Sequence, residues 1–171
     1  MKARTEDGTL VAPAMDARGR PCSIALSLQV VGEKWSLLAV REISFGNRRF
    51  GEIARNTGAP RDVLTVRLRH LESVGVLTRR QYQEHPPRYE YHLTEAGQDL
   101  QVVLTTLRAW GDRWLVGEPP ARFAHSCGEE LEMVHSCRAC GEEVAPEDLR
   151  LEVRAPGWDQ RGPVDPNADA R

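Results

Sequence analysis

The stretch from Thr57 to Val76 constrains the fold more than any other part of the chain. Gly58 tolerates the positive φ that ends a helix, and Pro60 suits the first position of the next helix. Three leucines then follow at helical spacing, Leu64, Leu68 and Leu71, and this spacing predicts one apolar face. The opposite face carries mostly groups that can reach a phosphate or the edge of a base: Arg61, Asp62, Thr65, Val66, Arg69 and Ser73. The pattern predicts a tight turn and an amphipathic helix that stops at Gly75, although an ordinary surface helix has the same pattern when it is taken alone.

Length and composition indicate a globular protein. A chain of 171 residues forms one domain, or one domain with a small appendage, and 40% apolar residues are enough to build a core. The sequence has no run of 18 apolar residues and no apolar segment near its N-terminus, so we expect neither a membrane span nor a signal peptide. We therefore expect a cytoplasmic protein, whose four cysteines are thiols or metal ligands rather than structural disulfides.

The charges are distributed unevenly along the chain. Residues 41–92 hold ten arginines and six acidic residues, a net charge of +4, whereas residues 117–155 carry a net charge of −5. A basic block between less basic flanks is typical of a surface that binds nucleic acid. The acidic segment is expected to be a separate unit that does not lie on DNA.

The segments that flank residues 57–76 complete a helix-turn-helix. The helix within residues 57–76 is the second helix of this motif, its recognition helix. Ser23 is placed to cap a short helix that Gly32 ends, and residues 33–44 predict a second helix that is apolar on nearly all sides. Residues 49–56 predict the first helix of the motif. After the recognition helix, residues 77–83 and 88–93 predict two strands around a stiff tip at residues 84–87. In the second strand Tyr89, Tyr91 and Leu93 alternate with Arg88, Glu90 and His92, which is typical of a half-buried strand. A hairpin in this position is a wing, although a purely structural hairpin with exposed arginines is the alternative.

This arrangement predicts which residues contact DNA. The recognition helix offers five residues to the major groove, namely Arg61, Asp62, Thr65, Val66 and Arg69. Arg88 on the wing, with Arg49 or Arg79, is expected to contact the phosphate backbone.

A helix of about 20 residues, capped by Thr94, follows the hairpin and carries a long apolar stripe: Leu100, Val103, Leu104, Leu107, Trp110 and Trp114. A small winged domain has little core left to cover this stripe. Pairing of two chains through it would place two recognition helices about one turn of DNA apart. The alternative is that the stripe packs on its own domain or on the C-terminal segment.

Several motifs resemble those of the HxlR-type winged helix-turn-helix regulators, which are related to the MarR family. They span Cys22 to about Trp114, and include Gly32-Glu33-Lys34-Trp35, Gly46-Asn47-Arg48-Arg49-Phe50, Val63-Leu64-Thr65, Gly75-Val76-Leu77, Pro86-Pro87-Arg88-Tyr89-Glu90-Tyr91 and Leu93-Thr94. The resemblance implies a homodimeric bacterial transcription factor that inserts its recognition helices into successive major grooves. It also implies that Cys22 stands where some members have a cysteine that senses oxidants or electrophiles. A helix N-terminus lowers the pKa of a thiol, but a small apolar residue that packs the helix entry is the alternative for Cys22.

The segment after residue 117 has the spacing of a zinc-binding module. Cys137 and Cys140 form a Cys-x-x-Cys-Gly turn, Cys127 supplies a third thiol, and His125 or His135 supplies a fourth ligand. Structural zinc would replace a core in a segment with few apolar residues, with reduced or redox-paired cysteines as the alternative.

An enzyme is not expected. The Cys-rich segment superficially resembles the zinc deaminases, but nine residues between its two parts are too few to build their two packed helices. An adaptor that binds a protein through the wing and the Cys-rich segment is a further alternative.

The sequence therefore predicts a mainly α fold with a small β-hairpin wing, an α+β winged helix-turn-helix, followed by a small β-rich C-terminal module. The expected boundaries are a flexible arm at 1–20, the DNA-binding and dimerisation domain at 21–116, the zinc-ribbon-like module at 117–155 and a flexible tail at 156–171. We expect the protein to regulate transcription as a homodimer on a palindromic operator, in response to a small ligand or to redox or electrophile stress.

Overall fold

A computed structural model describes residues 20–164, so most of the expected N-terminal arm and the end of the expected tail lie outside the described residues. The elements follow the chain as α1 (Ser23–Val31), α2 (Lys34–Ser44), α3 (Phe50–Thr57), α4 (Arg61–Ser73), β1 (Leu77–Gln83), β2 (Arg88–Leu93), α5 (Glu95–Trp114) and the 3-10 helix η1 (Pro146–Asp148). The chain divides into two compact units, with the boundary inside α5 between Leu107 and Arg108.

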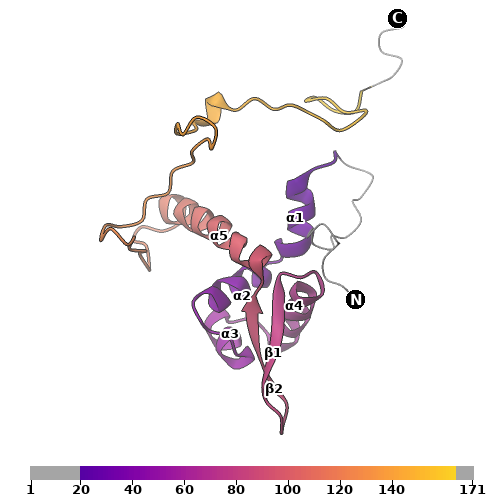
Figure 1. The fold of residues 1–171 in the computed structure, drawn as a ribbon, viewed down its shortest axis with the longest axis vertical. Coiled ribbons are helices and arrows are strands. Elements are labelled where there is room, and N and C mark those ends of the chain that lie inside the picture. Colours follow the sequence, from indigo (N-terminus) through magenta and orange to yellow (C-terminus); the bar gives the residue numbers. More distant parts are fainter. Residues whose placement is uncertain (1–19, 165–171) are drawn as a thin grey trace, which may run out of the picture. The chain divides into compact units, whose positions relative to one another are not determined.

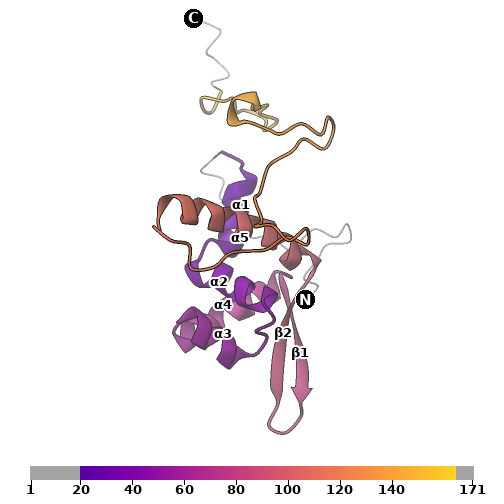
Figure 2. The same ribbon diagram turned by 90° about the vertical axis from the view of Figure 1, so that its left-hand side faces the viewer.

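The first unit is built around α4. Its Leu64, Leu68 and Leu71 are fully buried, as their spacing predicts, and α4 packs against α2 and β1. Gly58 adopts φ of 70° and ends α3, and Pro60 is the N-cap of α4. In Figures 1 and 2, α2, α3 and α4 form a compact group, and the hairpin extends beyond them. The remaining buried apolar residues come from neighbouring elements: Val31, Ala39, Val40, Ile43, Ile53, Ala59, Val74, Val76 and Leu77.

The two predicted helix caps have different outcomes. Ser23 is the first residue of α1 rather than its cap. The N-cap is Cys22, which makes no side-chain capping bond. The carbonyl of Ser23 accepts a hydrogen bond from the Ser27 hydroxyl. The prediction for Ser23 is therefore wrong. Thr94 does cap α5, because its Oγ1 accepts the N–H of Gly97 at 3.2 Å.

The antiparallel hairpin pairs Leu77 with Leu93 and Arg79 with Tyr91 on one face, and Thr78 with His92 on the other. The strand limits match the predicted residues 77–83 and 88–93. However, β2 is partly covered on both faces, since His92 keeps only 17% of its side-chain exposure. The loop before α3 also pairs with the outer edge of β2, where the carbonyl of Arg48 accepts the Tyr91 N–H at 2.9 Å.

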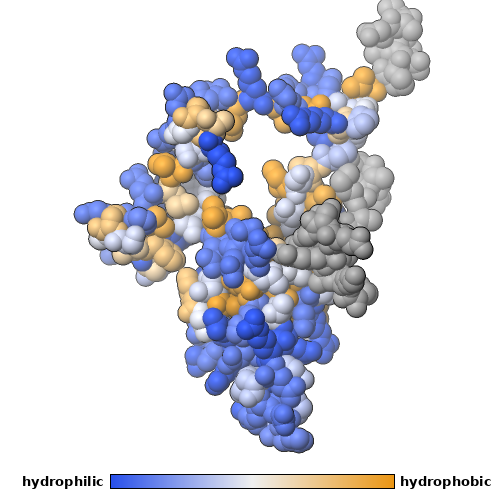
Figure 3. Space-filling model, in the orientation of Figure 1, coloured by the Kyte–Doolittle hydropathy of each residue, from blue (hydrophilic) through white to orange (hydrophobic). Residues whose placement is uncertain are grey.

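Helix α5 packs only one edge of its apolar stripe on the first unit. Leu100 and Leu104 lie against the core, whereas Val103, Leu107, Trp110 and Trp114 are about half exposed or more. On α1, Ile24 and Leu28 are also exposed. Figure 3 shows hydrophilic residues covering the hairpin, while hydrophobic residues reach the surface in the region of α5.

The second unit contains turns rather than the predicted β-rich module. Between residues 117 and 164 the described chain has isolated bridges and the short helix η1 but no strand, and none of these residues is buried. Part of the expected tail is included here, because Trp158 and Pro163 form one of the bridges.

Candidate nucleic-acid interface

A groove of about 500 Å³ lies between α3, α4 and the hairpin. Six of the eight residues predicted to contact DNA line it together: Arg49, Arg61, Thr65, Arg69, Arg79 and Arg88. The two others, Asp62 and Val66, are exposed on α4 but do not line this groove. The fold thus brings five guanidinium groups from distant parts of the sequence to one concave surface.

Aromatic rings in the groove were missed by the sequence prediction. The guanidinium of Arg79 lies 4.3 Å from the ring centre of Tyr89, and that of Arg49 lies 4.6 Å from the ring centre of Tyr82. On the opposite wall, Arg61 stacks over Phe50 at 4.8 Å. Stacking of this kind holds an arginine side chain in one direction and leaves its N–H groups available. Arg79 and Tyr89 lie on the two predicted strands, so the sequence could have indicated their contact, whereas Arg49 lies before α3 and its contact with Tyr82 depends on tertiary packing.

Carboxylates orient two of the arginines. Arg49 Nε donates to Glu90 Oε1 at 3.1 Å, and Arg79 Nε lies 3.6 Å from Glu72 Oε1. Among the described residues, the guanidinium groups of Arg69 and Arg88 have no ion pair, hydrogen bond or ring contact. Arg69 and Arg88 are therefore the arginines of the groove most available to an external anion.

Burial raises the pKa of the Tyr91 phenol, which also lines the groove. The phenol consequently stays protonated at neutral pH and can donate a hydrogen bond to a phosphate oxygen.

A buried carboxylate, which the sequence analysis did not single out, holds the first helix of the motif in place. Glu42 on α2 is 4% exposed, and its Oε2 accepts hydrogen bonds from Asn47 at 2.8 Å and from Asn56 on α3 at 2.9 Å. Arg41 donates to the other oxygen at 2.7 Å and 3.0 Å. Burial opposes ionisation, but the hydrogen bonds from Asn56 and Arg41, the charge of Arg41 and the bond from Asn47 together lower the pKa of Glu42. The ionised group thus joins α2, the following turn and α3 into one rigid platform for α4.

The cysteines do not gather into one site. Within residues 20–164, no group of three or more potential metal ligands lies close enough together to hold a metal ion, so His125, Cys127, Cys137 and Cys140 are not assembled as a set. Cys137 and Cys140 do form a local pair, and the backbone N–H groups of Cys140 and Ala139, with the Cys140 side chain, lower the pKa of the Cys137 thiol. Cys22 is partly exposed at the N-cap of α1, and all four cysteines are free thiols.

A helix, a tight turn, a second helix and a basic antiparallel hairpin define a winged helix-turn-helix protein. Residues 30–119 match the model of the HxlR-like helix-turn-helix family. The chain belongs to this family of transcriptional regulators.

Individual relatives agree with this assignment. An uncharacterized HTH-type transcriptional regulator of Mycobacterium tuberculosis is 44% identical over 139 residues, which are 80% of this chain and 87% of the relative. The crystal structure of PA1607, described as a transcription factor, matches with a TM-score of 0.70 and 30% identity, covering 80% of this chain and 96% of that one. PA1374 from Pseudomonas aeruginosa matches with a TM-score of 0.57 and 33% identity, covering 82% and 97% of the two chains. These relatives are named as regulators rather than enzymes. No helix in the described part of the chain is long and apolar enough to cross a membrane.

Proposed function

We propose that the protein binds a palindromic DNA operator in the cytoplasm as a homodimer and regulates transcription in response to a chemical signal. The observation that carries this proposal is the groove in which α4, the hairpin and the N-cap of α3 present five arginines on one surface. In this arrangement α4 enters the major groove, and the hairpin lies along the adjacent backbone. Within α4, Arg61, Asp62, Thr65, Val66 and Arg69 contact base edges, while Arg49, Arg79 and Arg88 contact phosphates.

The proposed roles of Arg69 and Arg88 are tested by comparing Arg69→Ala and Arg88→Ala in operator binding. We expect Arg69→Ala to weaken operator binding by about 1–3 kcal/mol and to relax specificity at one base pair, because it removes a base contact. Arg88→Ala is expected to weaken binding to all sequences alike and to reduce the slope of log K against log salt by about 1. Fluorescence anisotropy at several salt concentrations, with matched operator and scrambled duplexes, measures both effects.

Arg150→Ala is the control, since this exposed arginine lies in the acidic segment outside the groove. An Arg69→Ala protein that retains full operator affinity at fixed salt would remove Arg69 from base recognition. A salt slope that does not change in Arg88→Ala would remove the wing from the phosphate backbone. If the wild-type chain binds no duplex above the non-specific level, the adaptor alternative gains support.

The second chain of the dimer is proposed to cover the exposed side of α5. Val103, Leu107, Trp110 and Trp114 follow one another at spacings of four, three and four, which places them on one side of the helix. A run of apolar side chains of this length is rarely left in water by a protein that acts alone. Self-association also supplies the two-fold symmetry that a palindromic operator requires.

Two kinds of signal are consistent with the chain. One is a small ligand, for which the first unit contains a cavity beside the hairpin. The other is oxidation or alkylation of Cys22, whose partly exposed position at the start of α1 gives a reagent access to the thiol.

We also propose that His125, Cys127, Cys137 and Cys140 bind one structural zinc ion. Two short hairpins in the second unit support this set because their backbone hydrogen bonds correspond one to one. In the first, the N–H groups of Leu131, His125 and Gly128 donate to Phe123, Glu129 and His125; in the second, those of Val144, Cys137 and Gly141 donate to His135, Glu142 and Cys137. Each hairpin has a cysteine followed by a glycine at positive φ, at Gly128 and Gly141.

The correspondence distinguishes between the two histidines. His125 occupies the position of Cys137, a ligand position, whereas His135 occupies the position of Phe123 at the base of the hairpin. Each hairpin therefore offers two ligands, and one tetrahedral ion would join the two hairpins. Because no residue from 117 to 164 is buried, the free energy of metal binding would stabilise a segment that lacks an apolar core.

Native mass spectrometry of protein purified without chelator is expected to find one zinc ion per chain, lost on denaturation. His125→Ala is expected to abolish stoichiometric zinc, and the matched variant His135→Ala is expected to retain it. Wild-type protein that carries no metal would contradict the proposal. A mass two hydrogens lower per chain would assign the cysteines to a disulfide instead.

A further inference from the structure

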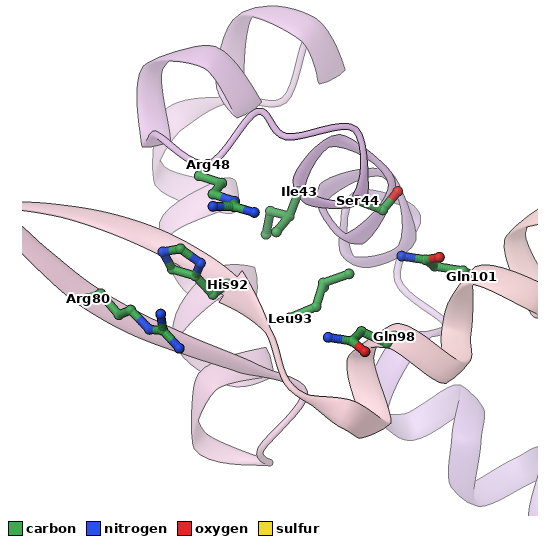
Figure 4. Close-up of a pocket in the computed structure, with 8 residues that line it drawn as sticks. All are labelled: Ile43, Ser44, Arg48, Arg80, His92, Leu93, Gln98 and Gln101. Atoms are coloured by element: carbon green, nitrogen blue, oxygen red, sulfur yellow. The ribbon is translucent and has the colours of Figure 1, made fainter.

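A second cavity, of about 280 Å³, lies on the side of the hairpin that faces away from the DNA-binding groove. Its walls come from the end of α2, the loop before α3, both strands and the start of α5, all within the first unit. Figure 4 shows Arg48, His92 and Arg80 on one side of the cavity, Gln98 and Gln101 on the other, and Ile43 and Leu93 between them.

The positive charges that line the cavity are not balanced by carboxylates of the protein. Among the described residues, the guanidinium groups of Arg48 and Arg80 have no ion pair or hydrogen bond. Glu90 is opposite Arg80 in the ladder, but its Oε1 accepts the bond from Arg49, and its Oε2 is 3.9 Å from His92 Nε2. Burial, followed by the charges of Arg48 and Arg80, lowers the pKa of His92. The cations around His92 are therefore not neutralised by the protein itself.

We propose that this cavity binds a small organic carboxylate and is the effector site of the regulator. Arg48 and Arg80 hold the carboxylate, since a planar guanidinium matches its two oxygens, and His92 donates from its ring. The side chains of Ile43 and Leu93 contact a short apolar body. The amides of Gln98 and Gln101 accept or donate hydrogen bonds at the far end.

The assignment of the cavity as an effector site rests on the proposed function. The position of the cavity links the two. Arg80 and His92 lie on one face of the hairpin, and Arg79 and Tyr91, which line the DNA-binding groove, lie on the other. The hairpin is thus a wall shared by the two sites, and Gln98 and Gln101 belong to α5, which carries the proposed dimer surface. A carboxylate that binds the DNA-free and DNA-bound forms with different affinity shifts the balance between them.

Butyrate is the probe, and butyramide, which has nearly the same shape but no charge, is its matched control. Titration followed by NMR is expected to shift the His92 imidazole resonances with butyrate and leave them unchanged with butyramide. Arg48→Gln and Arg80→Gln are each expected to weaken butyrate binding about tenfold or more, as the loss of a charged hydrogen bond does. Arg150→Ala is expected to bind butyrate as the wild type does, because Arg150 lies outside the cavity.

Equal binding of butyramide, or unchanged butyrate affinity in both glutamine variants, would overturn the proposal. Tighter binding of inorganic phosphate than of butyrate would replace the carboxylate by a phosphate group. If Arg48→Gln and Arg80→Gln reduce the salt slope of DNA binding in the absence of butyrate, the cations belong to the DNA surface, and the proposal fails.

Two independent results separate this inference from the proposed function. Butyrate binding at His92 without any operator binding would retain the site and remove its role as an effector site. Operator binding with no resonance shift at His92 would retain the regulator and remove the site. Arg48 and Arg80 are both exposed, so the glutamine variants are expected to fold; should they not, the wild-type titration decides.

Discussion

Replacing Leu107 with aspartate is expected to separate the proposed homodimer into monomers and to abolish tight operator binding. The Leu107 side chain lies in the middle of the exposed side of α5, and it is 50% exposed in the single chain. Within one chain an aspartate there costs some helix propensity and part of the leucine's burial, which leaves the core of the first unit intact. In a dimer it would place an unpaired carboxylate within an apolar contact, which costs about 3–5 kcal/mol and weakens association about 100-fold or more. Operator affinity falls with it, because each monomer then binds one half-site.

Ala109→Asp is the matched control, since Ala109 is exposed on the same helix but lies about half a turn away from Leu107. It introduces the same charge and a comparable loss of helix propensity. Sedimentation velocity is expected to give monomers for Leu107→Asp and dimers for Ala109→Asp and the wild type. If Leu107→Asp remains a dimer with full operator affinity, the second chain does not cover this side of α5.

The sequence predicted those parts of the fold in which one local pattern decides the outcome. The strand limits were correct because the second strand alternates apolar and polar residues, and the tip before it contains two prolines that end the first strand. The buried leucines of α4 were correct because three apolar residues at helical spacing leave only one side for the core. Ser23 was assigned wrongly as a cap because the helix starts one residue earlier than the composition suggests, and a one-residue shift is beyond what propensity resolves.

The remaining features depend on contacts between distant segments. Nothing near Glu42 in the sequence indicates that the side chain of Asn56 on α3 will donate a hydrogen bond to its carboxylate on α2. Alternation placed His92 on the exposed face of β2, but Arg48 and α5 cover that face and create the second cavity. Eight DNA contacts were predicted from charge and spacing, yet the meeting of six of these residues in one groove follows from the packing of α3 and α4 against the hairpin. Charge patterning predicts which residues matter, while tertiary packing determines which of them act together.

Gly97→Ala is expected to lower the free energy of unfolding of the first unit by about 2 kcal/mol or more, even though alanine favours helices. Gly97 is buried in the first turn of α5, where a Cβ would lie well inside van der Waals contact with the Val76 carbonyl oxygen. It would also meet the Leu93 side chain at 3.3 Å. The Val76 oxygen cannot move away freely, because it accepts hydrogen bonds from the N–H and the hydroxyl of Thr94, both at 3.1 Å.

The same substitution at Gly111 provides the control and has the opposite expected sign. Gly111 also lies within α5, but no atom stands within 4 Å of the position that its Cβ would take. Gly111→Ala should therefore raise stability by up to about 1 kcal/mol through helix propensity alone. Chemical denaturation of both variants measures the two changes. If Gly97→Ala were as stable as the wild type, the start of α5 would not lie this close to the Val76 carbonyl. The hairpin, which lies between the groove and the second cavity, would then be held at a different angle to α5.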